Sequence, residues 1–462
     1  MTSLSYTPVR VINDKVYDIR VDVEVSNPRK QLLTVQVSLL PVAYEHLPSE
    51  AFPKEDPRVT TLQPAGLEKE ILSTVFSDLK GGREYDLRAV AADSSGMVDE
   101  RTSRTNYIRE FENLGAILES KGVTVIADYY TWYESPGKPN AAWGAQGTQH
   151  AHVYMPLLGE YDSADPTVIA RHIDWATGYG ISAFAISWWG DPNSTTDVNA
   201  HPNDLPKFEG AFLKHHMLNQ IKFCILYENN GRLKITNPDD PAEKWIEDLD
   251  DPFNRSRLLS DFEYLTKYFS DSQYLRIGGK PCVRFDYTVP FRGDIEGVLG
   301  EVRTRLRAMG WEIYLINDLA GRSVNPADLI SVEALDWRYP NVSPAHALQV
   351  IENTDAIGGS GPPPGENYKI WSDFSMERQK DFVPLSWPGQ HIHPSICPTC
   401  VPVPRSPEYF RDLLEQSIRY ATKKTIEIAA FDEWYAGIGI EPAQEYGLTY
   451  LEVLKEVVSK IK

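Results

Sequence analysis

The stretch DPTVIARHIDWATGYGISAFAISWWG, residues 165–190, contains one complete helix signal followed by one complete buried-strand signal. Asp165 can cap the helix, Pro166 suits its first turn, and Gly180 suits its end. The apolar run 181–189 follows directly and is typical of a strand that is covered on both faces. This succession predicts one unit of a parallel α/β fold.

Similar units repeat from residue 123 to the end of the chain, and most of the predicted strands are followed by an amphipathic helix. The other seven strands are predicted at VTVIADYY (123–130), IKFCILYE (221–228), PCVRFDYT (281–288), EIYLINDL (312–319), LISVEALDW (329–337), FVPLSW (382–387) and TIEIAAFDEW (425–434). Eight parallel units predict a (β/α)8 TIM barrel over residues 109–462, an α/β fold whose active site lies at the carboxyl ends of the strands.

Nearly every predicted strand ends in a carboxylate or a large aromatic residue. Carboxylates bind sugar hydroxyls and aromatic rings pack against the C–H face of a pyranose, so these ends predict a site for a neutral, hydroxyl-rich ligand. For each tryptophan alone, packing in the core is an equally good explanation. The residues expected to contact substrate are Tyr129, Tyr130, Trp132, His152, Trp188, Trp189, Asp286, Tyr287, Asp336 and Trp434.

Residues 1–108 carry a different pattern, in which apolar and polar residues alternate. The alternation is clear in VYDIRVDVEV (16–25), in LTVQVSLL (33–40) and in REYDLRAVAADSSG (83–96). A period of two indicates half-buried strands. We therefore predict a small all-β sandwich of the immunoglobulin/fibronectin III type as a separate domain before the barrel.

The segment from Asp78 to Gly96 resembles the late strands of a fibronectin type III domain. Leu79, Gly82 and Tyr85 are spaced like the tyrosine corner of such sandwiches. No exposed aromatic cluster is visible in this domain, so a brace or spacer is expected rather than a sugar-binding module.

Charge and composition restrict the class of partner. The chain has 46 basic and 65 acidic residues and a net charge of -19, which argues against binding to nucleic acid or anionic lipid and favours a neutral or cationic partner. No apolar run is long enough for a membrane span and no signal peptide is visible. We expect a cytoplasmic protein, or a secreted one if a leader has been removed. Of the four cysteines, Cys224 and Cys282 lie in apolar runs that predict buried thiols.

Four segments resemble glycoside hydrolase family 99, the endo-α-mannosidase and mannanase family. They are residues 150–190, CILYENN around Glu228, GGKPCVRFDYT ending at Thr288, and FDEWYAGIGIEP at 431–442. The similarity extends from about residue 124 to the C terminus. A group of family 99-like proteins in polysaccharide biosynthesis, often labelled glycosyltransferases, shares these features.

The resemblance implies a retaining, α-mannosidase-type reaction on an oligosaccharide or polysaccharide. In the family motif N-E-W-H-E-G, the first Glu takes the proton of the sugar 2-hydroxyl, so that the substrate supplies its own nucleophile through an epoxide-like intermediate. The second Glu is the acid/base for the leaving oxygen. On this chain the first role falls on Glu433 and the second on Ala436, which has no proton to give, while Glu228 matches a Glu that contacts substrate.

Loss of general acid assistance costs about two to four orders of magnitude in rate. Strand alternation predicts that Glu427, Ala429, Phe431 and Glu433 face the lumen of the barrel. It predicts that Ile426, Ile428, Ala430 and Asp432 face the helices, which removes Asp432 as a partner for Glu433. The remaining substitutes are Glu441, Asp286, Asp336 and Tyr435, and the catalytic set that we predict is Glu433, Glu228 and Glu441.

The stretch HIHPSICPTC places His391, His393, Cys397 and Cys400 within ten residues. These are the ligands of a tetrahedral structural zinc site. A Cys397–Cys400 disulfide and histidines that line the sugar site are the two alternatives. The reaction itself requires no cofactor.

Two functions of different classes follow. The first is a glycoside hydrolase acting on α-mannoside-like or related glycans. The second is a catalytically silent glycan-binding protein, because of Ala436. A glycosyltransferase-like role in polysaccharide biosynthesis is a variant of the first, although no P-loop or Rossmann phosphate loop is visible.

Overall fold

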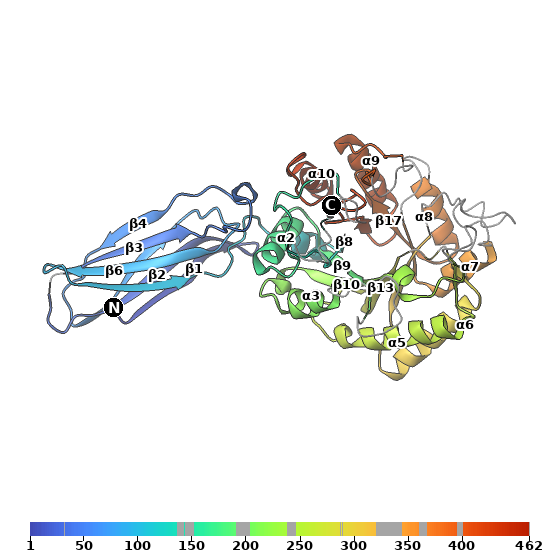
Figure 1. The fold of residues 1–462 in the computed structure, drawn as a ribbon, viewed down its shortest axis with the longest axis horizontal. Coiled ribbons are helices and arrows are strands. Elements are labelled where there is room, and N and C mark those ends of the chain that lie inside the picture. The colour runs from blue at the N-terminus through green and yellow to red at the C-terminus, as the bar shows by residue number, and fades with distance from the viewer. Residues whose placement is uncertain are drawn as a thin grey trace.

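The computed structural model places a β-sandwich at one end of the molecule and a helix-wrapped barrel at the other (Figure 1). The structure describes residues 1–31, 33–135, 143, 152–190, 204–237, 246–286, 288, 290–319, 344–359, 367–394 and 401–461. In this part of the chain, no helix combines the length and the apolar character that crossing a membrane requires.

The N-terminal domain consists of two antiparallel sheets, as the alternating pattern predicts. Its strands are β1 (Ser3–Ile12), β2 (Lys15–Ser26), β3 (Leu33–Pro41), β4 (Arg58–Leu62), β5 (Lys69–Phe76), β6 (Tyr85–Asp93) and β7 (Val98–Arg104). One sheet has the order β1-β2-β5 and the other the order β4-β3-β6-β7. Every second residue of β2, from Ile19 to Val25, is buried between the sheets.

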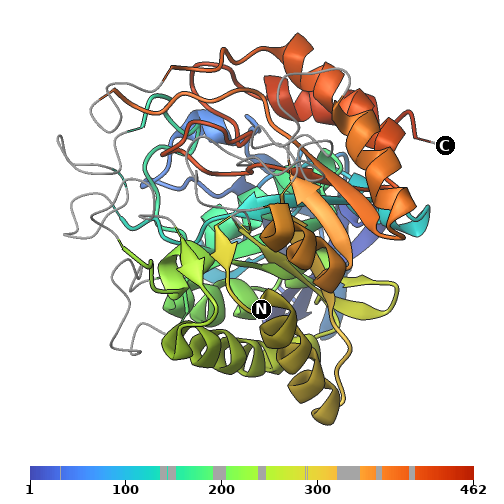
Figure 2. The ribbon, with the colours of Figure 1, turned by 90° about the vertical axis from the view of Figure 1, so that its right-hand side faces the viewer.

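The barrel has eight parallel strands in sequence order. They are β8 (Thr124–Tyr129), β9 (Ala183–Trp188), β10 (Lys222–Tyr227), β13 (Lys280–Phe285), β15 (Tyr314–Asp318), β16 (Ala356–Gly359), β17 (Asp381–Ser386) and β18 (Thr425–Ile428). Each strand pairs with the next, and β18 pairs with β8, so the sheet closes on itself. The (β/α)8 TIM barrel predicted from the sequence is confirmed, and Figure 2 shows it from the side opposite the sandwich.

Helices cover the outside of the barrel. They are α1 (Leu114–Ser120), α2 (Pro166–Gly178), α3 (Asp204–Gly210), α4 (Asn229–Arg232), α5 (Pro252–Phe269), α6 (Ile295–Ala308), α7 (Pro344–Asn353), α8 (Asn367–Glu377), α9 (Pro407–Tyr420) and α10 (Thr449–Val458). Short strands β11 (Glu247–Asp248), β12 (Arg276–Ile277) and β14 (Phe291–Arg292) lie in the connections. The predicted start of α2 is confirmed, because Asp165 accepts hydrogen bonds from the backbone of Thr167 and Val168.

One barrel strand differs from the prediction. The place between β15 and β17 belongs to β16, with the sequence AIGG, and not to residues 329–337, which lie outside the described residues. Strand β16 has only four residues, two of them glycines. Gly358 is required there because a Cβ atom would lie 2.4 Å from the Asn317 carbonyl oxygen. Such a short and glycine-rich segment lacks the apolar run on which strand prediction depends.

The last barrel strand also ends earlier than predicted. Strand β18 stops at Ile428, so the alternation of faces does not extend to Phe431. The Phe431 ring packs instead outside the lumen, 5.3 Å from the rings of Phe184 and His172. The predicted lumen position of Phe431 is therefore wrong, because residues after Ile428 form loop and not strand.

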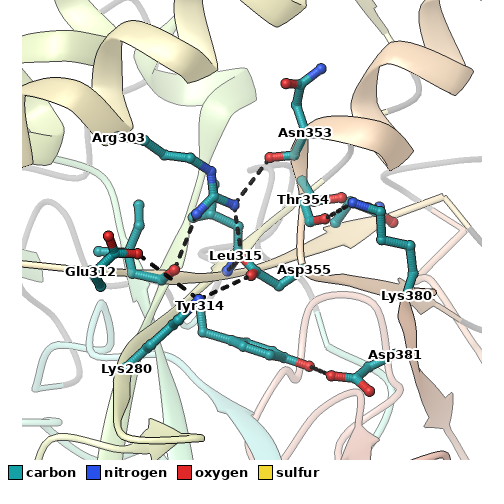
Figure 3. Close-up of polar contacts among 12 residues, drawn as sticks. Lys280, Arg303, Glu312, Tyr314, Leu315, Asn353, Thr354, Asp355, Lys380 and Asp381 are labelled. Carbon is teal, nitrogen blue, oxygen red and sulfur yellow. Dashed lines mark hydrogen bonds and ion pairs between the residues drawn. The ribbon is translucent and has the colours of Figure 1, made fainter. Parts of the chain in front are cut away.

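The amino-terminal ends of β15, β16 and β17 are held by a dense polar cluster (Figure 3). The Asp355 carboxylate accepts hydrogen bonds from the Arg303 guanidinium at 2.7 Å and from the Leu315 backbone at 3.0 Å. Lys380 donates to the backbone carbonyl of Thr354, and the Tyr314 hydroxyl donates to Asp381 at 2.6 Å. This is the stability face of a TIM barrel, opposite to the face that carries active sites.

The sandwich joins the barrel through α2. Asp174, which is fully buried, accepts hydrogen bonds from the backbone of Glu110 and Phe111 and from the Tyr107 hydroxyl. Arg171 reaches the other way and donates to the Ala51 carbonyl at 2.9 Å. These two side chains, one helical turn apart, thus connect α2 to the chain between the domains and to the connection between β3 and β4 of the sandwich.

Candidate active site

Three carboxylates stand at the carboxyl end of the barrel, where the topology predicts an active site. Glu228 follows β10, Asp286 follows β13, and Glu433 lies in the loop after β18. A fourth, Asp128, lies near the end of β8. Glu228 and Asp128 are buried, whereas Asp286 and Glu433 are half-buried. Segments more than 300 residues apart in the sequence are thus brought to one end of the barrel.

The carboxylates are close enough to change one another's ionisation. Burial, followed by the charges of Asp128 and Asp286, raises the pKa of Glu433 to about 8. Burial and then the Asp286 charge raise the pKa of Glu228 well above its ordinary value. A carboxyl group with a raised pKa in a TIM-barrel mouth can hold and transfer a proton near neutral pH.

The Tyr130 hydroxyl lies among these carboxylates. Burial and the charges of Glu433, Glu228, Asp128 and Asp286, in that order, raise the pKa of the Tyr130 phenol. Tyr130 directly follows β8, and the effect of all four acids on its pKa places it near them. The hydroxyl is therefore a neutral hydrogen-bond donor at the centre of an acidic group.

A chain of hydrogen bonds orients Glu228. The Ser187 hydroxyl, on β9, donates to the Glu228 carboxylate at 2.6 Å and accepts from the Trp189 indole nitrogen at 2.8 Å. Ser187 is buried. It connects a carboxylate to an aromatic ring at the mouth of the barrel.

Aromatic rings form one wall of the site. The Tyr130 and Trp132 rings stack with centroids 4.5 Å apart, and the Trp132 and Trp189 rings are 6.0 Å apart. Trp132 and Trp189 are half-buried, so their rings are accessible to a ligand. An aromatic wall beside carboxylates suits a sugar, whose apolar face and hydroxyls need different partners.

An ion cluster lies below the site inside the barrel. Arg284 on β13 donates to Glu427 on β18 at 3.0 Å and to both oxygens of Asp128 at 3.1 and 3.2 Å. Burial raises the pKa of Asp128 to about 6 and that of Glu427 to about 8, although the Arg284 charge opposes both shifts. Arg284 thereby joins three barrel strands beneath the carboxylates of the barrel mouth.

Several of the predicted substrate-binding residues pack away from the mouth. Tyr129 stacks on Phe184 and its hydroxyl lies 3.0 Å from His172 Nδ1 on α2. Trp188 packs against Tyr227 and against Tyr264 of α5. Both side chains point outward because they alternate with residues that face the lumen.

The predicted catalytic residue Glu441 lies in a closed hydrogen-bond network. Its carboxylate accepts from the Tyr161 hydroxyl at 2.7 Å and from the Trp434 indole nitrogen at 3.0 Å, and His172 Nε2 is 3.1 Å away. Glu441 is fully buried and Trp434 is 2% exposed. Both residues therefore hold the loop after β18 and do not line the barrel mouth.

Asp432 and Glu433 have different surroundings. Strand alternation predicted this separation, although both residues lie in the loop after β18 and not in the strand. The Asp432 carboxylate is fully buried and accepts a hydrogen bond from the Tyr130 backbone at 2.9 Å. After burial, the largest influence that raises its pKa is Glu441, ahead of Glu433. Ala436 is 6% exposed and its carbonyl accepts a hydrogen bond from the His391 backbone at 3.1 Å.

The remaining predicted residues lie apart from this group or outside the described residues. His152 is half-buried and its ring is 5.5 Å from that of Trp143. Tyr287, Asp336, Cys397 and Cys400 lie outside the described residues. The zinc site therefore stays a prediction. Within the described ranges, no three or more histidine, cysteine or acidic side chains are placed to hold a metal ion.

The sequence analysis did not select Ser187 and Arg284, two residues that shape the site. Asp128 belonged to the carboxylates at strand ends but not to the predicted set of site residues. Arg284 had a usable signal, because a charged residue inside an otherwise apolar strand must face a partner in the lumen. Ser187 had none, since a serine in a buried strand is more often bonded to nearby backbone.

No model of a known protein family matches the sequence. The chain is 20% identical over 397 residues to the uncharacterized protein WxcX of Xanthomonas campestris pv. campestris, an alignment that covers 75% of this chain and 51% of WxcX. The chain thus spans about half the length of the curated relatives that it matches.

Two solved structures resemble about three quarters of the chain. The GH99 endo-α-mannosidase from Bacteroides thetaiotaomicron has a TM-score of 0.53 at 18% identity, covering 73% of this chain and 96% of that one. A glycoside hydrolase-like protein has a TM-score of 0.53 at 18% identity, covering 74% and 94%. The chain has the fold of these proteins. At 18% identity the likeness shows the fold but not the activity, which depends on the residues of the site.

Proposed function

We propose that this protein is a glycoside hydrolase that acts on α-mannoside-like or related glycans at the carboxyl end of its barrel. One observation carries the proposal, which is the convergence of Glu228, Asp286 and Glu433 around the Tyr130 hydroxyl, beside an aromatic wall. Two carboxyl groups with different ionisation are what glycosidic cleavage requires. The fold shared with GH99 endo-α-mannosidase supports the choice of substrate.

Within this proposal Glu433 takes the proton of the sugar 2-hydroxyl and the reaction retains configuration. Position 436 carries alanine, so the leaving oxygen must receive its proton from another group. Asp286 is the best placed, because it is half-buried and acts on the pKa of both Glu433 and Glu228. Glu441 is less suitable, since its carboxylate is enclosed by Tyr161, Trp434 and His172.

Incubation with α-mannan oligosaccharides tests the activity, and proton NMR of the first product reports its anomeric configuration. We expect hydrolysis with retention by the wild type, a loss of at least about a hundredfold in Glu433→Gln, and no change in Glu415→Gln. Glu415 is an exposed acid on α9 and serves as a charge-matched control. Inversion of configuration would contradict the assigned route.

The specific feature that favours a second function, a silent glycan-binding protein, is Ala436. The two functions are separated by comparing Ala436→Glu with the isosteric Ala436→Gln. If only Ala436→Glu hydrolyses the oligosaccharides, the natural chain is a binder that lacks one proton donor. Hydrolysis by the wild type that depends on Glu433 rules out the silent function.

We also infer that the N-terminal sandwich is fibronectin type III-like. The three-plus-four strand order supports this, as does the Tyr85 hydroxyl, which accepts a hydrogen bond from the Gly81 backbone at 3.1 Å. Its expected role is a brace for the barrel, through the Asp174 and Arg171 contacts.

A further inference from the structure

The loop that carries Glu433 is not held in place by strand pairing, because β18 ends at Ile428. Among the described residues, burial and two neighbouring charges shift the pKa of Glu433, and no hydrogen bond contributes. The place of its carboxylate in the barrel mouth therefore depends on how the backbone on either side of it is held.

The Tyr133 hydroxyl bonds to the backbone on both sides of Glu433. It donates to the Asp432 carbonyl oxygen at 2.8 Å and accepts from the Trp434 amide at 3.0 Å. Burial raises the pKa of the Tyr133 phenol well above its ordinary value, so the hydroxyl keeps its proton and can donate and accept at once. One side chain thus brackets the two peptide units between which Glu433 lies.

Tyr133 is itself held firmly by its neighbours. It lies in the loop after β8, which is the barrel strand that pairs with β18, and it is 1% exposed. Its ring stacks on that of Trp143 with centroids 4.3 Å apart and meets the edge of the Tyr161 ring at 5.6 Å. A close-packed ring has little freedom to move, so its hydroxyl offers a fixed point to the loop after β18.

Another hydrogen bond joins the ends of β8 and β18 before Glu433 is reached. The Phe431 amide donates to the Asp128 carbonyl oxygen at 2.7 Å. This bond fixes the loop on the near side of Glu433, whereas the Tyr133 hydroxyl also holds Trp434 on the far side.

We propose that Tyr133 is a positioning residue, which holds the Glu433 carboxylate where it can take the proton of the sugar 2-hydroxyl. The inference rests on the proposed function and adds to it a residue too buried to touch the substrate. Proton transfer depends steeply on geometry, and a displacement of about 1 Å can cost about a hundredfold in rate. A hydroxyl that only stabilises the loop would change folding but not the relation between kcat and KM.

The variant Tyr133→Phe removes the hydroxyl and keeps the ring on Trp143. We expect kcat for α-mannan oligosaccharides to fall about ten- to a hundredfold, with KM changed less than about twofold, because the lost contact serves the transition state and not binding. Tyr274→Phe is the matched control. The Tyr274 ring is 2% exposed and its hydroxyl donates to the Cys282 carbonyl oxygen, in the amino-terminal half of β13, at 2.9 Å. This control should leave kcat unchanged.

A second measurement does not depend on activity. Because burial penalises the ionised form of Glu433, Glu433→Gln should raise the urea midpoint at pH 9. If the Tyr133 hydroxyl keeps Glu433 in that place, Tyr133→Phe lets the carboxylate move towards water. The rise in midpoint that Glu433→Gln produces should then shrink by at least about half in the Tyr133→Phe background and stay unchanged in the Tyr274→Phe background.

The outcomes separate this inference from the proposed function. An unchanged kcat in Tyr133→Phe, a loss that Tyr274→Phe reproduces, or a change in KM as large as that in kcat overturns the positioning role and leaves the glycosidase proposal standing. If the wild type cleaves nothing, the proposed function fails, and the urea midpoints still decide whether Tyr133 holds Glu433.

An equal effect of Glu433→Gln with and without the Tyr133 hydroxyl, or no effect in the wild type, overturns the inference. If circular dichroism shows that Tyr133→Phe is unfolded, both measurements are made in about 1 M trimethylamine N-oxide, which favours the compact state.

Discussion

Glu433 combines a raised pKa with access to ligand, and its role decides how activity depends on pH. If it acts as the base, it must be ionised, and its pKa of about 8 means that much of it is protonated at neutral pH. We expect kcat/KM for α-mannan oligosaccharides to rise with pH towards about 8 as Glu433 ionises, and to fall again once the group that protonates the leaving oxygen loses its proton. A fall as the pH rises towards about 8 would show that Glu433 is the proton donor instead.

The same raised pKa predicts an effect on stability. The ordinary pKa of Glu is about 4.3 in the unfolded chain, so between about pH 4.3 and 8 unfolding releases a proton that the folded state retains. The stability contributed at low pH is therefore lost as the pH rises through the folded-state pKa. Glu433→Gln should match the wild type near pH 4 and be more stable by about 1–3 kcal/mol above pH 8.

Urea unfolding at pH 4, 7 and 9 measures this difference, with Glu415→Gln as the control for removing a surface acid. A Glu433→Gln variant that is less stable than the wild type at pH 9 would mean that the carboxylate makes a favourable contact when ionised.

At the scale of the elements, the sequence predicts seven of the eight barrel strands within a few residues. Long apolar runs with clear boundaries were sufficient for these strands. Strand β16 was not predicted, because AIGG forms a strand through its pairing with β15 and β17 and not through its own composition. The end of β18 was predicted too late in the sequence, because nothing in TIEIAAFDEW marks Ile428 as the last paired residue.

The buried ion pairs of Arg284 connect three barrel strands, so their contribution to stability can be tested at the scale of the elements. Arg284 bonds to acids on β8 and β18 from its place on β13. Arg284→Met leaves Asp128 and Glu427 buried without a cation, which should cost about 3–5 kcal/mol. Glu427→Gln keeps a hydrogen-bond acceptor and removes a group whose pKa is already about 8, so it should cost only about 0.5–1.5 kcal/mol.

Urea denaturation at pH 7 of both variants, with Arg101→Met as an exposed-arginine control, compares the two costs. Equal losses for Arg284→Met and Glu427→Gln would show that the ion cluster contributes nothing beyond the packing of its side chains.

For the whole molecule, the alternating and apolar patterns distinguish a sandwich from a barrel, but they do not show how the two are joined. That junction depends on Asp174, whose partners are the Glu110 and Phe111 backbone amides and the Tyr107 hydroxyl. A buried acid on a helix gives no sign in the sequence of the amides that it will meet. The active-site residues were predicted as a pool of strand ends, and only the folded barrel separates those at the mouth from those that pack outward.

Replacement of Asp174 should uncouple the two domains. Asp174→Ala leaves two half-buried amides and the buried Tyr107 hydroxyl without their acceptor, which costs about 1–3 kcal/mol in all, and we expect calorimetry to resolve separate unfolding transitions for sandwich and barrel. Asp412→Ala, an exposed acid on α9, is the control. A single transition in Asp174→Ala, shifted or not, would show that other contacts suffice to couple the domains.

The hydrogen bonds that run from Trp189 through Ser187 to Glu228 give the protein a built-in optical reporter. A ligand that draws Glu228 away from Ser187 changes the polarity around one indole, so the emission of Trp189 should shift in wavelength as the site fills. Subtracting the spectrum of Trp189→Phe isolates that signal from the other ten tryptophans, and occupancy could then be followed by fluorescence without labelling either the protein or the sugar.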